Sequence, residues 1–465
     1  MLASIRSHWQ NAVRGFWLFP GLTAFAFAVT AVALVEVDRR AGADAIRHTF
    51  DGDASAARSI LETVGGTVIT VAGLAFSITV VTVQLVSSQF SPRALRSFLA
   101  DRPSQLMAGA FVGIFAYCLL VLRTVRDEDG GADEFVPSVS VTVAIVLGLV
   151  GLVLLLAFIH RITQVIKVES VTARISAETL DAIDARYPEP FGPPAGQELV
   201  HAPAARGDSR PQMIRSDRSG YVRAVETDRL GKLALPGPAR VHVVVKPGDQ
   251  VTTSTPVARI WCPEALDDGV VDDVRGAITV QRERDVAADP AFGIRQLTDI
   301  GLRALSPGVN DPTTAITCIG YVQGALERLA TRAFPEALQR PDPEGTLVEL
   351  TATSFEDVLH EPFADLARVA SGDARVVRAM LDALAGIAAA AVEAGAGDRA
   401  AAATAAAAEI AAPALEDART AADRMLVADG LARVRAVRQS TRQGPDGTRL
   451  SGPSAASSTR STGTA

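Results

Sequence analysis

The sequence has little of what an enzyme or a metalloprotein needs. Its three cysteines are far apart and its six histidines are scattered, so neither residue type has the spacing of a zinc site or a disulfide framework. No phosphate-binding loop of the Walker A or dinucleotide-binding type precedes a helical segment. We therefore expect no catalytic residues, no cofactor, no metal ion and no enzymatic activity.

Lysine is also scarce. Only Lys167, Lys232 and Lys246 occur among the 45 basic residues, and the formal net charge is −7. An acidic chain without a basic cluster lacks the electrostatic footprint of a nucleic-acid-binding protein, so we expect no nucleic-acid partner. The excess of arginine over lysine and the alanine-rich helices are typical of a GC-rich bacterial genome.

What the sequence does have is long apolar runs, concentrated before residue 165. Apolar residues make up 48% of the chain, and its mean hydropathy is +0.22. A helix needs about 20 apolar residues to cross a bilayer. Four runs meet this length and predict a four-span transmembrane domain over residues 1–168, with spans at 16–35, 61–88, 106–122 and 136–159.

The loops between these runs differ in charge. The loop 89–105 holds Arg93, Arg96 and Arg102 against Asp101 alone, whereas the loop 123–135 contains five acidic residues. Because cytoplasmic loops carry the excess of basic residues, this asymmetry predicts a multi-pass protein of the bacterial plasma (inner) membrane with both termini in the cytoplasm.

The second run is too polar for a simple lipid anchor. Between Glu62 and Arg93 it carries no ionised residue, yet seven small, hydroxyl-bearing or amide-bearing residues recur at helical spacing along one face. A helix that only faces lipid has no need of such a face. We call these residues the stripe: Thr63, Gly66, Thr70, Gly73, Ser77, Gln84 and Ser87.

Two interpretations of the stripe remain open. It could pack against neighbouring helices within one four-helix bundle, where small residues are expected. Alternatively, several copies in a homo-oligomer could place it around a common axis, forming a hydrated path for a small ion or solute. In that case Arg93, Arg96 and Arg102 would lie at the cytoplasmic mouth and bias the path toward anions.

The rest of the chain is predicted to be soluble. A juxtamembrane helix that continues the fourth span is followed by a linker, together covering 169–209. Short strands then predict a small β-rich domain at 210–288, and helical patterns cover 289–440 apart from one strand at 346–351. The Gly/Ser/Thr/Pro-rich tail, 441–465, is expected to be disordered.

The segment 241–260, VHVVVKPGDQVTTSTPVARI, resembles one half of a biotinyl/lipoyl-type barrel-sandwich domain. The resemblance implies a β-barrel-like module. Those carrier domains present a modifiable lysine on a hairpin that this chain lacks, so no covalent cofactor is expected. Within the segment, Pro247-Gly248 occupies the two central positions of a type II turn.

The loop 306–314, SPGVNDPTT, also has two interpretations. Its polar residues could form a ligand or anion site at the start of a helix. Alternatively, Asp311 is the N-cap and Pro312 the first helical residue, which explains the same residue types by capping alone. The candidate site residues are Ser306, Asn310, Asp311, Thr313 and Thr314.

Three long segments resemble the bacterial family of predicted membrane proteins called domain of unknown function 2254. They are GDASAARSILETVGGTVITVAGLAFSITVVTVQLVSSQFSPRALRSFLADR at 52–102, LVLRTVR at 120–126 and FGIRQLTDIGLRALSPGVNDPTTA at 292–315. The resemblance extends over about residues 15–435. It implies an integral membrane protein with a cytoplasmic C-terminal region and implies no activity.

The sequence therefore predicts an α-helical membrane protein with four transmembrane helices, followed by a cytoplasmic β-barrel-like unit and an α-helical domain. Its partners would be the lipid bilayer and further copies of itself. We interpret it as an oligomeric, channel-like permeation path with a cytoplasmic assembly or gating region. The alternative is a non-conducting membrane scaffold or sensor whose cytoplasmic domain binds a protein or a small ligand.

The predicted topology can be tested with a reporter that is active only in the periplasm. Fused after Ser170 the reporter should be silent, and fused at Gly130, in the acidic loop, it should be active. The opposite pattern of reporter activity would reverse the orientation.

Overall fold

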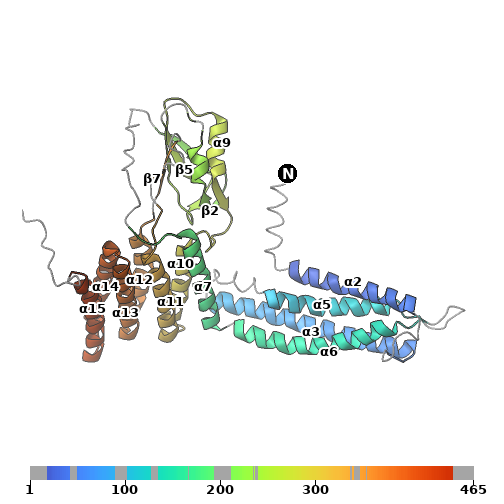
Figure 1. Ribbon diagram of the computed structural model, residues 1–465. Coiled ribbons are helices and arrows are strands. Elements are labelled where there is room, and N and C mark those ends of the chain that lie inside the picture. Colours follow the sequence, from blue (N-terminus) through green and yellow to red (C-terminus); the bar gives the residue numbers. More distant parts are fainter. Residues whose placement is uncertain are drawn as a thin grey trace, which may run out of the picture. The chain divides into compact units, whose positions relative to one another are not determined.

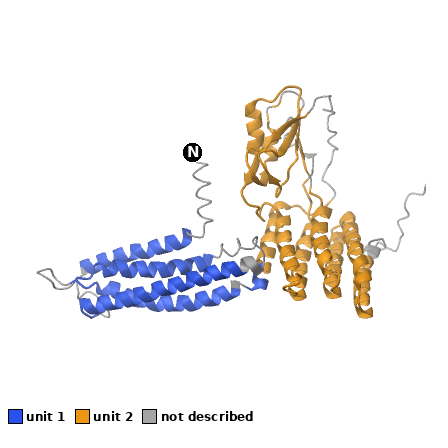
Figure 2. Cartoon of the chain, turned by 180° about the vertical axis from the view of Figure 1, so that it is seen from behind, with its two compact units in different colours: residues 1–171 blue, residues 172–465 orange. Residues whose placement is uncertain are grey.

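The computed structural model describes residues 18–41, 50–89, 102–126, 135–165, 167–192, 211–233, 235, 239–335, 338–339, 346–351 and 353–442. The chain divides into two compact units, residues 1–171 and 172–465 (Figure 2). Of the tail predicted to be disordered, Thr441 and Arg442 belong to the last helix and the remaining residues lie outside those described.

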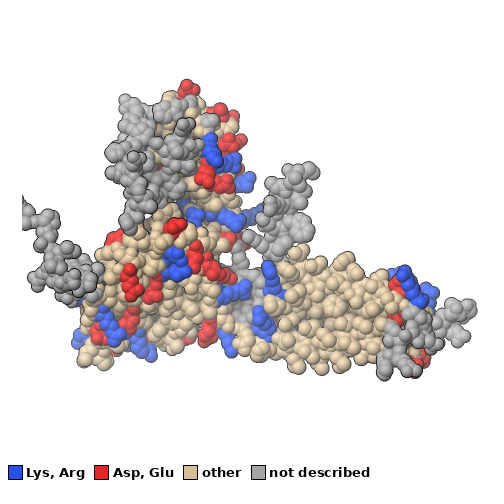
Figure 3. Space-filling model, viewed as in Figure 1, with Lys and Arg blue, Asp and Glu red and all other residues tan. Residues whose placement is uncertain are grey.

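Within its described residues, unit 1 contains four helices that are long and apolar enough to cross a membrane, which agrees with the number of spans predicted (Figure 1). Over these helices the visible surface of the bundle carries no charged side chain, and the charges gather at its two ends (Figure 3). The second helix has 36 residues and is about 54 Å long at 1.5 Å per residue, well above the ~30 Å hydrocarbon core. The helices are α2 (Leu18–Ala41), α3 (Ala54–Gln89), α5 (Arg102–Leu122) and α6 (Ser138–Val165).

Helix α5 forms the centre of unit 1, since it packs against α2, α3 and α6. Two glycines one turn apart, Gly109 and Gly113, let α2 approach closely. A Cβ atom at Gly109 would lie 2.6 Å from the Cα atom of Pro20, and one at Gly113 would lie 2.6 Å from the ring of Phe27. This is the close approach that small residues four apart permit between membrane helices.

Polar groups fasten three helices at one end of the bundle. The Asp38 carboxylate of α2 accepts hydrogen bonds from the backbone N–H groups of Val139 and Ser140 at 3.0 Å and from the Ser140 hydroxyl at 2.6 Å. It thereby satisfies N–H groups in the first turn of α6 that have no partner within that helix. The buried Tyr117 hydroxyl of α5 donates to the Ser140 carbonyl at 2.9 Å.

Unit 2 begins within α7 (Val168–Arg186), and here one prediction is wrong. The juxtamembrane helix was expected to continue the fourth span, but α6 ends at Val165 and Lys167 lies outside any helix. The Lys167 carbonyl instead accepts from the N–H groups of Ser170 and Val171, at 3.0 and 3.2 Å. It therefore starts a new helix, and the chain has two helices where one was predicted.

The β strands of unit 2 form two open sheets. One has the order β1-β5-β3-β8-β7 and the other β4-β2-β6, and all pairings are antiparallel except that of β3 with β8. Two short helices, α8 (Thr227–Gly231) and α9 (Asp268–Ala277), accompany them. The strands are β1 (Gln212–Arg215), β2 (Gly220–Val225), β3 (Arg240–Val243), β4 (Gln250–Val251), β5 (Pro256–Trp261), β6 (Ile278–Gln281), β7 (Leu338–Gln339) and β8 (Leu347–Leu350).

The predicted barrel is therefore wrong: the described strands close no barrel. The physical reason is β8, which lies more than 100 residues after β3 in the chain and pairs with it in parallel. The edge of β3 that a closed barrel would use is thus occupied. The sequence correctly predicted a strand at 346–351 but did not show that it joins this sheet.

Six longer helices complete unit 2. The central one, α13, packs against α11, α14 and α15. Its core positions are apolar and fully buried, among them Met380, Leu384 and Ile387. The helices are α10 (Pro290–Ala304), α11 (Pro312–Ala330), α12 (Phe355–Ala370), α13 (Ala374–Glu393), α14 (Gly397–Asp417) and α15 (Ala421–Arg442).

The close approach of α2 and α5 predicts a specific weakness. Gly109→Ala should lower the stability of the purified full-length protein by about 1–3 kcal/mol, because the new methyl group meets backbone atoms that cannot move aside. Thermal unfolding in detergent measures the change. Gly21→Ala on α2 is the control, since no atom lies within 4 Å of its new methyl group. Equal unfolding temperatures for the two variants would contradict this packing.

Candidate functional site

The stripe on α3 lies on the outside of the bundle. Thr63, Gly66, Thr70, Gly73, Ser77 and Gln84 are all exposed. The opposite face of α3 fills the bundle core, with Leu61, Val68 and Ala75 at most 5% exposed. In a single chain these residues therefore make no close packing contact with the other described helices. The side chain of Ser87 is not among those described.

The stripe differs from the other outer surfaces of unit 1. Helix α6 presents large aliphatic side chains outward, including Leu149, Val153 and Leu156, each at least 64% exposed. On the stripe, no atom lies within 4 Å of where a Cβ atom would stand at Gly66 or Gly73. The stripe is thus a shallow, weakly polar strip of backbone and small side chains beside a lipid-like surface.

Two stripe hydroxyls are satisfied within their own helix. Thr63 donates to the Ser59 carbonyl at 2.6 Å, and Thr70 donates to the Gly66 carbonyl at 2.8 Å. Each hydroxyl therefore uses its proton in a hydrogen bond within the helix, and its oxygen keeps a lone pair that can accept a hydrogen bond from outside. Such groups tolerate an apolar neighbour and can also accept a hydrogen bond from water or a passing solute.

The predicted mouth is described only in part. Arg93 and Arg96 lie outside the described residues. Arg102 is the first residue of α5, and its guanidinium lies 5.3 Å from the centre of the Phe19 ring of α2. It is exposed and forms a cation–π contact rather than pointing into a bundle interior.

The loop 306–314 is explained by helix capping. The Asp311 carboxylate accepts from the Thr314 N–H at 3.1 Å and from the Thr314 hydroxyl at 2.6 Å, and Pro312 begins α11. These bonds hold the pKa of Asp311 below its usual value. Asn310 adopts a left-handed conformation with φ +49°, and the Ser306 hydroxyl donates to the Arg303 carbonyl. Thr313 is exposed, and its carbonyl accepts from the Thr317 hydroxyl.

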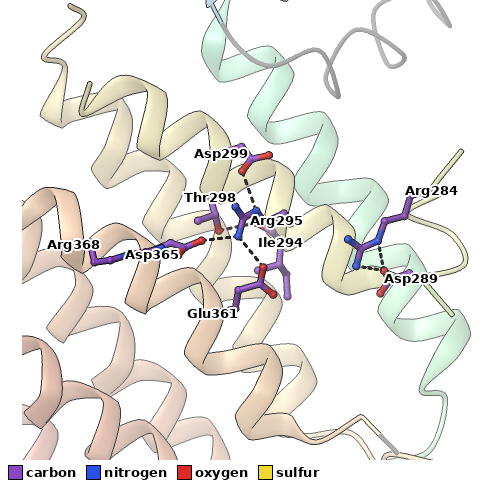
Figure 4. A network of polar contacts seen from close by, with 9 residues as sticks. All are labelled: Arg284, Asp289, Ile294, Arg295, Thr298, Asp299, Glu361, Asp365 and Arg368. Atoms are coloured by element: carbon purple, nitrogen blue, oxygen red, sulfur yellow. Dashed lines mark hydrogen bonds and ion pairs between the residues drawn. The ribbon is translucent and has the colours of Figure 1, made fainter. Parts of the chain in front are cut away.

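A charged cluster joins α10 to α12 (Figure 4). The Arg295 guanidinium donates to Asp299 at 3.0 Å, to Glu361 at 2.8 Å and to Asp365 at 2.6 Å, and Arg368 also bonds Asp365. Arg295 and Asp299 are four residues apart on α10, whereas the other two carboxylates come from α12, a separate segment. These ion pairs hold α10 against α12. Within the described residues, no group of three His, Cys, Asp or Glu side chains could hold a metal ion.

Sequence reasoning missed a cavity of about 250 Å3 in unit 2. Segments far apart in the chain line it: the end of α7, the end of β2 with the start of α8, the turn after β3, the start of α10, the end of α11 with the segment after it, the end of β8 and the first turn of α12. Among the described residues that line it, Asp289, just before α10, is the only acidic one. Other lining residues include Arg186, Tyr187, Lys246, Phe334 and Thr351.

Asp289 is buried but not unpaired. Arg284 donates to it through Nε at 2.8 Å and approaches through Nη2 at 2.6 Å (Figure 4). Burial raises the pKa of the Asp289 carboxyl, although the Arg284 charge opposes this shift. The KPGD turn packs directly on this carboxylate, because a Cβ atom at Gly248 would lie 2.2 Å from Asp289 Oδ2. The only sequence signal for this site was the turn itself.

The capping role of Asp311 predicts a modest, pH-dependent effect. Asp311→Ala should cost about 1 kcal/mol of unfolding free energy at pH 7, whereas Asp311→Asn should cost much less because it keeps a capping oxygen. Because the folded-state pKa is lowered, the stabilisation from the carboxylate is present above its ordinary pKa and is lost as the pH falls through the folded-state value. Chemical denaturation between pH 7 and pH 3 tests both points. A constant difference between wild type and Asp311→Ala across this range would refute them.

Comparison with known proteins shows where the chain belongs. The family model described as a predicted membrane protein, DUF2254, matches residues 14–386. Uncharacterized proteins of Mycobacterium bovis and Mycobacterium tuberculosis are each 32% identical to the chain over 390 residues, which span 83% of this chain and 73% of each relative. No solved structure matches. The chain belongs to the DUF2254 family of predicted membrane proteins.

Proposed function

We propose that this protein is an oligomer in the bacterial plasma membrane whose copies meet at the stripe of α3. The shared axis would form a channel-like path for a small ion or solute, and unit 2 would serve in assembly or gating. The observation that carries the proposal is the outward position of the stripe. The bundle core is filled by the other face of α3, so a partner for the stripe must come from outside the chain.

The composition of the stripe supports a second copy rather than lipid. Gly66 with Thr70, and Gly73 with Ser77, are pairs of small residues four apart. In membranes such pairs let two backbones approach closely and gain van der Waals contact. A helix face in contact with lipid tails usually carries large apolar side chains instead, as the outer face of α6 does. A self-complementary strip on every copy is also the condition for closed symmetric assembly.

A path along the axis follows from the same residues. Rings of Thr, Ser and Gln present oxygen and amide groups without fixed charge, and such rings pass small hydrated solutes with weak selectivity. The four-helix bundle of one chain is filled by apolar side chains such as Phe111 and Ile114. The path therefore requires several copies. The proposal contains no enzymatic step, since the sequence contains no catalytic constellation.

The proposed orientation places both termini and unit 2 in the cytoplasm. Support comes from the arginines of the loop 89–105 and the acidic residues of the loop 123–135. The relatives of the chain are bacterial, which is in keeping with the plasma membrane.

Cysteine accessibility in native membranes tests the path. Thr70→Cys, Ser77→Cys and Gln84→Cys should react with a small charged thiol reagent. Ile69→Cys and Phe76→Cys are the matched controls, because these residues are 39% and 55% exposed but lie one position off the stripe. They should face lipid and stay unreactive. The three native cysteines are buried and should add little background.

A flux measurement in liposomes completes the test. Gln84→Leu should lower flux and leave the size of the purified oligomer unchanged, because Gln84 belongs to neither small-residue pair and its replacement puts an apolar constriction in the path. Stripe cysteines that cross-link between copies but never react with the charged reagent would support a non-conducting scaffold or sensor instead. If they neither cross-link nor react, the stripe faces lipid and the proposed oligomer is wrong.

A further inference from the structure

The cavity of unit 2 has an unbalanced charge. Lys246 and Arg186 both line it, and neither forms an ion pair with a carboxylate within the described part of the chain. The one acidic lining residue, Asp289, is already neutralised by Arg284. The Asp289 charge also acts on Lys246, so that Arg284, Lys246 and Arg186 share one carboxylate and leave an excess of two positive charges at the lining and beside it. Lys246 is half-buried and Arg186 is exposed, and an excess of positive charge at a partly enclosed site favours the binding of an anion there.

A neutral hydrogen-bond donor lies beside these charges. The Tyr187 ring packs on Phe334 with 4.8 Å between ring centres. Burial raises the pKa of Tyr187, so its hydroxyl stays protonated at neutral pH. This hydroxyl has no hydrogen-bond partner among the described residues. It is therefore available to donate to a ligand oxygen.

The position of Lys246 is fixed by its backbone. The Lys246 N–H donates to the Asp249 carboxylate at 2.9 Å, and the Lys246 carbonyl accepts from the Asp249 N–H at 3.1 Å. Gly248, with φ +94°, completes the predicted type II turn and presses against Asp289. The turn that resembled part of a carrier domain thus places Lys246 at the wall of a cavity.

We propose that this cavity binds a small phosphate monoester, with Lys246 and Arg186 pairing with the phosphate dianion and Tyr187 donating to one of its oxygens. A dianion matches the two uncompensated charges, and charge-assisted bonds from arginine and lysine are the usual means of phosphate recognition. The volume of about 250 Å3 corresponds to about eight water molecules at ~30 Å3 each. That space holds a phosphate and a short organic group, which would contact the apolar part of the lining formed by Val225, Val245 and Phe334.

Calorimetric titration of the purified full-length protein in detergent tests this site with glycerol 3-phosphate as the probe and glycerol as its uncharged control. We expect binding of glycerol 3-phosphate alone, weakening as the pH falls from 7.5 to 5.5 because the phosphate loses its second charge near pH 6. Lys246→Gln and Arg186→Gln should each weaken binding at least tenfold. Lys232→Gln, which removes an exposed lysine of the same β region outside the cavity, should change it less than twofold.

Two further measurements make the result decisive. The unfolding temperature of each variant shows whether a loss of binding comes from a loss of the fold. The variant Lys246→Arg keeps the positive charge and should therefore retain binding. Repeating the titration in nanodiscs with and without phosphatidic acid identifies the source of the ligand, since a lipid headgroup in the site would compete with glycerol 3-phosphate. No binding of the probe and no competition would overturn the proposal, as would equal binding by the Lys246→Gln and Lys232→Gln variants. Neither outcome depends on the flux through the membrane unit.

Discussion

The close approach of α2 to α5 is the contact on which unit 1 depends. Gly109 and Gly113 admit α2 on one side of α5, and α3 and α6 then pack on the remaining sides. On α3 the glycine that meets α5 is Gly65, whose Cβ position lies 3.3 Å from the Cβ atom of Cys118. This contact turns one face of α3 inward and forces the stripe outward. The exposure of the stripe is therefore a consequence of how α5 is buried.

In unit 2 the comparable contact is the KPGD turn on Asp289. It brings a strand connection against the start of a helix that follows about 40 residues later, and the Arg284 guanidinium neutralises the carboxylate between them. Elsewhere in the unit, arginines join segments in the same way. Arg328 and Arg332 hold Asp184 of α7, and the buried Arg399 donates to three carbonyls at the end of α11 while it lies among three phenylalanine rings. Arg186 and Lys246, which line the cavity, have no such ion pair within the described residues.

Local features of this protein were predictable from its sequence, and features made by distant segments were not. The four apolar runs, the turn at Pro247-Gly248 and the Asp311 cap each depend on a few consecutive residues, because hydropathy, backbone conformation and capping act locally. The pairing of β8 with β3 and the cavity depend on segments more than 100 residues apart. Helical spacing placed the stripe on one face of α3, but it could not say which face turned inward, since the inward face also contains a glycine and a threonine, Gly65 and Thr82.

The two proposed sites lie in different units, which limits how one could act on the other. The chain passes between the units near residues 165–172, where α6 ends and Lys167 separates it from α7. A ligand in the cavity changes a path through the membrane only if it binds two conformations of the protein with different affinity. Arg186, at the end of α7, is one of the two cations that would hold the phosphate. A phosphate bound to Arg186 would contact α7, the helix that follows the membrane unit in the chain. A change in the conformation of α7 is therefore the route by which the ligand would affect the membrane unit.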